Sequence, residues 1–336
     1  MTKNKILSIA ATVLLSTLGM SAQADIVQKR ILGFSGVQDM VNDIDNVDKT
    51  LVIVDFQDAT LGITCNYEEP TAENCPYLGS RPWFNWQLSL LENESESDYL
   101  VAKDKAELIE ISNVFLETSA MEYVEESIPT ILDTFAKDNI RVMFITQYGS
   151  LHRIVESKGI SMPLNEKEKT SLADIMALKS PMLNEPLTAL AVCNSTEKAK
   201  VNYQNGVLYT AAENKGEAIQ CFLEQYNAQL SELAEADKTD EADEAKESSD
   251  GNKTAEEARK VVYVNDSYQE SEDLYNVYRG NNDYDIFSLY YAKADNQWKP
   301  LLADGKEAEL QMAAHKEWLE MKESVFKKVY FDGTEK

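Results

Sequence analysis

The sequence predicts an α/β protein built on an open, mainly parallel β-sheet. Three short apolar runs rich in β-branched residues predict buried strands at residues 50–55, 140–146 and 260–266. Each run ends in polar residues, and apolar residues at helical spacing lie between the first two runs. Strands that alternate with helices favour a parallel sheet, and ligands bind such sheets outside the carboxyl ends of the strands.

Other segments carry their own periodicity or turn signals. The Asn-Gly pair within residues 203–210 predicts a turn. Apolar spacing predicts helices and one further strand elsewhere. The expected helices lie within 102–139, at 128–135, and at about 216–226, 270–278 and 306–327, and the expected strand lies near 285–291.

The first 24 residues are typical of a secretory signal peptide. Lys3 and Lys5 precede an apolar run from Ile6 to Met20, and Ala22-Gln23-Ala24 supplies a small-residue cleavage site. The run is shorter than the roughly 20 residues that span a bilayer, and no later segment is apolar enough to do so. We expect an exported protein of the periplasm or the extracellular space, with a retained N-terminal anchor as the alternative.

The chain is strongly acidic, with a formal net charge of −26. Removing residues 1–24 takes away two lysines and no acid, so the mature charge becomes −28. Such a charge argues against nucleic-acid and anionic-lipid partners and attracts cations. Residues 228–258 hold eleven acids, three lysines and no aromatic residue, which predicts a solvated helix or a disordered, low-complexity insertion.

Four cysteines in an oxidising compartment favour disulfides. Cys65 and Cys75 flank a short loop and are the expected pair, and a Cys193–Cys221 bond is also possible. Zinc is disfavoured because the cysteines show no CxxC spacing and have no histidine nearby.

The polar residues at the strand ends occur in the order Asp55 and Asp58, Thr146, Lys215, and Asp266. This order resembles the motifs of the haloacid-dehalogenase-like superfamily of phosphohydrolases. More narrowly, the chain resembles an uncharacterised family, a domain of unknown function, of exported bacterial haloacid-dehalogenase-like proteins. The stretches that carry this resemblance are 54–61, 78–86, 206–210 with 214–216, and 264–267.

The resemblance implies a Rossmannoid parallel sheet with a mainly helical cap insertion. The core would comprise residues 25–61 and 138–336, and the cap residues 62–137. It also implies phosphoryl transfer, in which one carboxylate attacks phosphorus, a second protonates the leaving oxygen, and Mg²⁺ offsets the phosphate charge.

The resemblance assigns a role to each strand-end residue. Asp55 and Asp58 would be the catalytic carboxylates, and Thr146 and Lys215 would hold the transferring oxygens. The resemblance also implies a Mg²⁺ site with the ligands Asp55, Asp58, Asn265 and Asp266. Asn265 stands where the family pattern has an acid, and its amide oxygen can still bind Mg²⁺. Alternatively, strand-end acids and hydroxyls cap the next helix or turn.

The first motif departs from the family pattern. If Thr60 fixes the register, Asp58 is the acid/base and Phe56 occupies the nucleophile position, where it cannot attack. If Asp55 is the nucleophile, Gln57 occupies the acid/base position and cannot transfer a proton. A one-residue bulge would bring Asp55 and Asp58 together.

Three hypotheses about function follow. The first is an exported Mg²⁺-dependent phosphatase, a hydrolase acting on a small phosphorylated molecule. The second is a catalytically inactive binding or interaction module on the same fold. The third is a purely structural exported protein, whose acidic insertion and tyrosines would serve surface contacts. The sequence indicates no particular substrate or protein partner.

Overall fold

The computed structural model describes thirteen stretches of the chain. They are residues 26–46, 49–63, 65, 75–94, 96–119, 121–138, 140–147, 190–193, 201–204, 207–210, 214–240, 257–303 and 305–330. The predicted signal peptide, residues 1–24, and the part of the acidic segment at 241–256 lie outside these residues.

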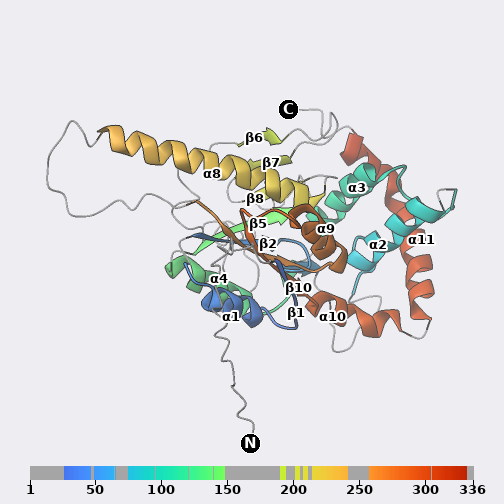
Figure 1. Ribbon diagram of the computed structural model, residues 1–336. Coiled ribbons are helices and arrows are strands. Elements are labelled where there is room, and N and C mark those ends of the chain that lie inside the picture. Colours follow the sequence, from blue (N-terminus) through green and yellow to red (C-terminus); the bar gives the residue numbers. More distant parts are fainter. Residues whose placement is uncertain are drawn as a thin grey trace, which may run out of the picture.

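An eight-stranded sheet forms the centre of the molecule (Figure 1), with the strand order β1-β10-β9-β2-β5-β8-β7-β6. All neighbours from β1 to β8 are parallel, whereas β7 pairs antiparallel with β8 and with β6. The strands are β1 Ile26–Ile31, β2 Thr50–Asp55, β5 Arg141–Thr146, β6 Leu190–Cys193, β7 Val201–Gln204, β8 Val207–Tyr209, β9 Lys260–Asn265 and β10 Asp285–Tyr291.

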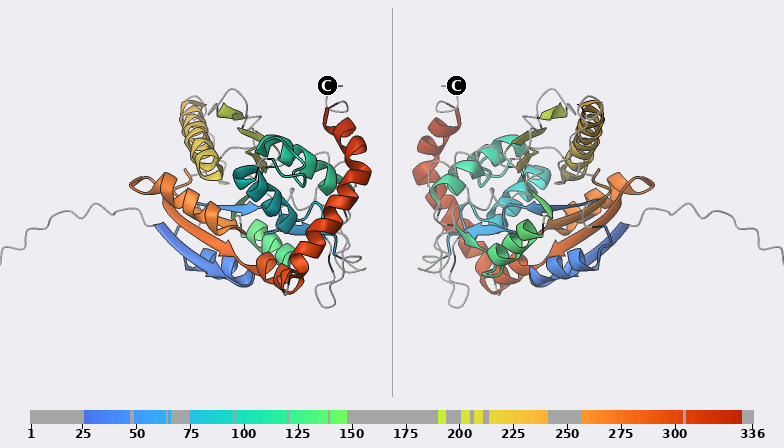
Figure 2. Two further views of the ribbon diagram at one scale, coloured as in Figure 1. Left: turned by 90° about the vertical axis from the view of Figure 1, so that its right-hand side faces the viewer. Right: turned by 90° about the vertical axis from the view of Figure 1, so that its left-hand side faces the viewer.

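Helices cover both faces of this sheet (Figures 1 and 2). Helices α8 (Lys215–Asp240) and α9 (Tyr268–Tyr278) lie on one face, and α1 (Ser35–Asp43) and α4 (Ile128–Lys137) on the other. The central strands are apolar on both sides because both sides are covered. The chain therefore folds as three layers.

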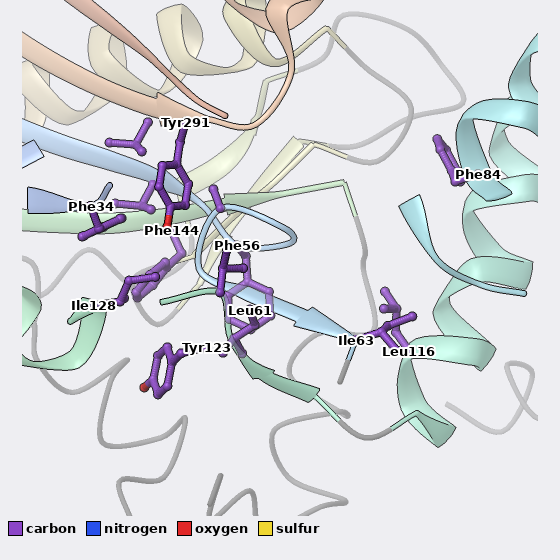
Figure 3. Packing of buried hydrophobic residues seen from close by; sticks show 14 of the residues in the cluster. Phe34, Phe56, Leu61, Ile63, Phe84, Leu116, Tyr123, Ile128, Phe144 and Tyr291 are labelled. Carbon is purple, nitrogen blue, oxygen red and sulfur yellow. The ribbon is translucent and has the colours of Figure 1, made fainter. Parts of the chain in front are cut away.

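Side chains alternate along β2 between the two layers. Leu51 and Ile53 pack with the apolar residues of α8 and α9. Val52 and Val54 pack with those of α1 and α4, in the larger cluster of which Figure 3 shows a part. All four side chains are fully buried, so β2 is anchored from both sides and its carboxyl end is held in place.

A second helical group lies beside the sheet (Figure 2). It contains α2 (Arg81–Asn93), α3 (Lys105–Thr118), α10 (Lys293–Leu302) and α11 (Lys306–Tyr330). Rings from α3 and α11 meet edge to face, since the ring centres of Phe115 and Trp318 lie 6.3 Å apart. The C-terminal helices therefore pack against a segment from the first half of the chain.

Helices α2 and α3 are bracketed by a two-stranded antiparallel ribbon. It pairs β3 (Leu61–Ile63) with β4 (Met121–Tyr123). Helix α4, which also falls within the predicted insertion 62–137, packs on β5 and connects directly to it. The segment that carries α2 and α3 is therefore connected to the rest of the chain through this β-ribbon.

The prediction of an α/β fold with a mostly parallel sheet is confirmed. The strands expected at 50–55, 140–146 and 260–266 are β2, β5 and β9, which are adjacent in the sheet. The predicted Asn-Gly turn falls between β7 and β8, which pair as antiparallel strands. Helix α8 extends to Asp240, so the first part of the acidic segment 228–258 is helical.

No helix in the described part of the chain is long and apolar enough to span a bilayer. The predicted disulfide between Cys65 and Cys75 is present, with a Cα–Cα distance of 4.3 Å. Cys221 on α8 is also disulfide-bonded. The side chain of Cys193, its expected partner, lies outside the described residues.

Replacing Cys65 and Cys75 together by serine is expected to lower the free energy of unfolding by about 2.5 kcal/mol. A crosslink that closes a ten-residue loop restricts the unfolded chain by an entropy of that size. Urea unfolding of the double variant and the wild type under oxidising conditions measures the difference. Equal midpoints and slopes would show that this crosslink does not stabilise the fold.

Candidate functional site

Asp55 is the last residue of β2, and its side chain is buried. The chain then makes a tight turn, in which the backbone N–H of Phe56 donates to the Ile145 carbonyl and the N–H of Leu61 donates to the Phe56 carbonyl. The Thr60 hydroxyl donates to the Asp55 carbonyl at 2.9 Å. These bonds fix the carboxylate of Asp55 at the edge of the sheet.

The next residue, Phe56, turns into the core. It is 2% exposed and packs edge to face on Phe144, with ring centres 6.0 Å apart. Figure 3 shows it in the apolar cluster beside Leu61. Phe56 therefore has a structural position in the core, whereas the neighbouring Asp55 lies at the edge of the sheet and lines a cavity.

Asp266 directly follows β9, the neighbour of β2 in the sheet. Four residues later, Glu270 lies in the first turn of α9. Asn265, the last residue of β9, uses its side chain locally, because its amide oxygen accepts from the Ser267 N–H and its amide nitrogen donates to the Ser271 hydroxyl. Asn265 thus supports the start of α9.

Lys215 is the first residue of α8 and bridges two of these acids. Its Nζ forms an ion pair with Asp55 and a second one with Glu270 at 2.8 Å. The neighbouring Gly216 makes this possible, since a Cβ there would lie 3.1 Å from the Leu274 Cα of α9. The glycine lets α8 and α9 approach closely, which brings the ammonium group to the two carboxylates.

Arg81 joins the inserted helices to the same edge of the sheet. It is the first residue of α2, and Ser80 caps that helix by accepting from the Trp83 N–H. The Arg81 guanidinium binds Asp266 through Nη1, 2.7 Å from Oδ2, and through Nη2, which donates to the main-chain carbonyl. The position of α2 is therefore tied to the end of β9.

Carboxylate oxygens of Asp55, Asp266 and Glu270 lie within 4.8 Å of one another. Lys215 and Arg81 supply two positive charges against these three acids. When all three acids are ionised, the cluster therefore carries one more negative charge than positive charges. Such a group of oxygen ligands is close enough to bind a metal ion.

Burial raises the pKa of Asp55 well above its usual range, and repulsion from Glu270 and Asp266 adds to this, while Lys215 only partly opposes it. Burial also disfavours the charged forms of Lys215 and Glu270, but their neighbours outweigh it. The carboxylates around Lys215 raise its pKa, and Lys215 lowers the pKa of Glu270. Asp55 is therefore the acid that would gain most from an additional cation.

We expect Mg²⁺ to stabilise the protein more at about pH 8 than at about pH 5. The pKa of Asp55 is raised in the folded, metal-free protein, so its contribution to stability is present at low pH and is lost as the pH rises through that pKa. A bound cation reverses this loss. Thermal unfolding with and without Mg²⁺ across this range measures the effect, and a pH-independent shift would argue against binding at Asp55.

These groups line a cavity of about 260 Å³ between the sheet edge and α2. From the sheet side come Asp55, Gln57, Asp58, Lys215, Asp266 and Glu270. Helix α2 contributes Arg81, Phe84, Asn85 and Leu88, which recur at helical spacing and so share one face. The cavity is open to small ligands and carries both signs of charge.

The structure brings together three of the predicted site residues, namely Asp55, Lys215 and Asp266. Asp58 lines the same cavity, but the three-acid cluster found in the described chain does not include it. Asp58 has a φ of 59° in the turn after β2, and its side chain also borders Gly62.

Thr146 ends β5 and is buried, and its carbonyl accepts from the Thr210 N–H. The next residue, Gln147, lines the cavity. Sequence reasoning missed Glu270 and Arg81. The sequence does place Glu270 one helical turn after Asp266, and it places Arg81 within residues 78–86, one of the stretches that carried the resemblance.

The fold and the site define an α/β protein with an acidic, lysine-centred cavity at the carboxyl edge of a parallel sheet. The chain belongs to the family described as a protein of unknown function, DUF2608, whose model matches residues 34–241. No curated protein and no solved structure matches the chain.

The expected membership of the haloacid-dehalogenase-like superfamily is wrong. The family that matches has no assigned function, and nothing in the comparisons links it to that superfamily. The resemblance rested mainly on polar residues at strand ends. Open α/β sheets of many families bind ligands at that edge, so polar residues there do not identify one superfamily. The expectation of a domain of unknown function is confirmed.

Proposed function

We propose that this chain is an exported, Mg²⁺-dependent phosphoric monoester hydrolase that uses Asp55 as its nucleophile. The observation that carries the proposal is the cluster of Asp55, Asp266 and Glu270 around Lys215, inside a cavity. Carboxylates that bind a hard cation and cationic side chains that bind an anion are the groups that phosphoryl transfer requires.

The donor set has the oxygen ligands that Mg²⁺ prefers. Oxygens bound to an octahedral Mg²⁺ are about 3 Å apart when adjacent and about 4.2 Å apart when opposite. The three acids, whose oxygens lie within 4.8 Å of one another, would close in around the ion when it binds. Lys215 pairs with Oδ2 of Asp55, and a carboxylate has two oxygens with several lone pairs, so the same group can also bind a cation.

In the proposed reaction an oxygen of Asp55 attacks phosphorus and the ester P–O bond breaks. The electron pair of that bond passes to the alcohol oxygen, which takes a proton from Asp58 or from water. Water then attacks the aspartyl phosphate, releases inorganic phosphate and restores the carboxylate. Lys215 and Arg81 would stabilise the negative charge on the transferring oxygens, and the cation would share that task.

A binding module is the second candidate, and Gln57 favours it. Gln57 lies two residues after Asp55 and lines the cavity, but its amide cannot donate or accept a proton in catalysis. On this alternative the same cluster binds a cation and a small phosphorylated molecule without turnover.

Two further features belong to the proposal. Helices α2 and α3 would act as a cap that selects the substrate, since one face of α2 forms a wall of the cavity. Export to the periplasm or beyond is supported by the Cys65–Cys75 disulfide, a bond that persists in oxidising compartments.

The test is release of inorganic phosphate from an aryl phosphate by the chain lacking residues 1–24, with Mg²⁺ and with a chelator. The proposal expects turnover that requires the cation. Asp58→Asn is expected to slow turnover about 100-fold if Asp58 protonates the leaving oxygen. A folded protein that binds phosphate in a Mg²⁺-dependent manner but releases none from the ester would favour the binding module.

A further inference from the structure

A second hollow adjoins the candidate site on the other side of α2. It is a groove of about 470 Å³ between α2 and α10, here called the α2–α10 groove. Its main lining residues are Arg81, Pro82, Trp86, Trp298, Lys299 and Leu302. Arg81 and Asn85 line both the groove and the site cavity, so the two spaces meet at the start of α2.

The two spaces differ in chemistry. The site cavity is lined largely by charged groups, whereas the groove combines the apolar Pro82, Leu302 and Trp86 with charged groups at its margin, namely Arg81, Lys299 and Glu307. Trp86 is half-buried and offers its ring to the groove, while Trp298, only 4% exposed, forms the floor beneath it. Tyr77 supports both rings from the core, with ring centres 6.5 Å from each of them. The aromatic surface is therefore held in place without a ligand.

The site cavity is smaller than most cavities that hold a whole substrate. Such cavities usually measure about 300–1,000 Å³, whereas the site cavity, at about 260 Å³, lies just below this range. A larger phosphate monoester would extend beyond it. The groove is the adjoining space, and it begins at Arg81, which ion-pairs with Asp266 of the cluster.

We propose that the α2–α10 groove binds the organic part of the substrate, and that this part is a flat, apolar group such as an aryl ring. The inference rests on the proposed function for the position of the phosphoryl group. Stacking on indole rings favours flat groups over polyhydroxylated ones. The chain would then prefer aryl phosphates to phosphates of small polar alcohols.

The test compares two phosphonates that cannot be hydrolysed, phenylphosphonate and methylphosphonate, by calorimetric titration at saturating Mg²⁺. Phenylphosphonate is expected to bind at least about tenfold more tightly. Trp86→Ala should remove this preference and leave the Kd of methylphosphonate within about twofold. Ser89→Ala is the matched control, because Ser89 also lines the groove and offers little apolar surface.

Leu302→Asp, on the opposite wall, tests the same point if Trp86→Ala does not fold. Equal affinities for the two phosphonates, no binding of either, or a preference that survives both variants would overturn the inference. A phenylphosphonate preference without ester hydrolysis would refute the hydrolase proposal alone. Hydrolysis without such a preference would refute the groove alone.

Discussion

Asp55→Asn is expected to lower Mg²⁺-dependent phosphate release by roughly three orders of magnitude or more, as the loss of a nucleophile does in other enzymes. The same change should not destabilise the metal-free protein, and we expect it to raise the free energy of unfolding by about 1 kcal/mol. The reason is that the site disfavours the ionised carboxylate, as the raised pKa of Asp55 indicates.

Lys215 keeps a partner in this variant. Its second ion pair, with Glu270 at 2.8 Å, remains, and Arg81 still binds Asp266. Two cations then face two acids, so no charge is left uncompensated. Chemical unfolding with a chelator present measures the stability, and phosphate release measures the activity.

Asp273→Asn is the matched control for both measurements. Asp273 lines the same cavity, and its carboxylate accepts from the Gln269 side chain one turn earlier in α9. Removing it changes the charge of the cavity equally without touching the cluster, so activity should stay within a few-fold. Turnover that persists in Asp55→Asn would exclude Asp55 as the nucleophile, and a large loss of stability would contradict the charge argument.

Lys215→Met is expected to lower the free energy of unfolding by about 3 kcal/mol at neutral pH, because it leaves the buried Asp55 and the partly buried Glu270 without their shared cation. Of the two, Glu270 should change most. In the wild type, Lys215 keeps the pKa of Glu270 below its usual range. Without the Lys215 cation, burial would raise the pKa of Glu270.

The loss should depend on pH in a defined direction. In the variant both folded-state pKa values lie above the unfolded ones, so stability is retained at low pH and falls as the pH rises through them. The deficit relative to wild type should therefore shrink on acidification. Lys105→Met, at an exposed lysine that lines the same cavity, should show little deficit at any pH. An equal deficit for Lys215→Met at every pH would show that lost packing, not charge, is the cause.

Much of the sheet could be predicted because its central strands are buried on both faces. Residues 50–55 and 260–266 are continuous apolar runs, which identify them without knowledge of the fold. The edge strand β1 was not found, because its central residues Val27 to Arg30 are exposed and Ile31 alone is fully buried. An edge strand of this kind has no recognisable period.

The candidate site was predictable only where a residue's role follows from its strand. Asp55 and Asp266 come at the ends of adjacent parallel strands and therefore had to meet. The role of Glu270 depends on where α9 begins, and that of Arg81 depends on how α2 packs on the sheet. The side chain of Asn265 accepts a hydrogen bond from the backbone N–H of Ser267 at the start of α9. The pattern of polar residues at strand ends does not reveal such a local role.

The sheet order also determines when this protein can finish folding. Among the strands that the structure describes, β1 pairs with β10 alone, and β10 ends at Tyr291. The ribosome makes the chain from the N-terminus onward. More than 250 further residues are therefore synthesised after β1 before β10 is available to pair with it. Strands so far apart in sequence pair slowly, because the intervening chain loses conformational entropy before the strand contacts contribute favourable free energy. Until then β1 exposes unpaired backbone groups that other chains could bind, and its Lys29 and Arg30 are residues of the kind that discourage such pairing.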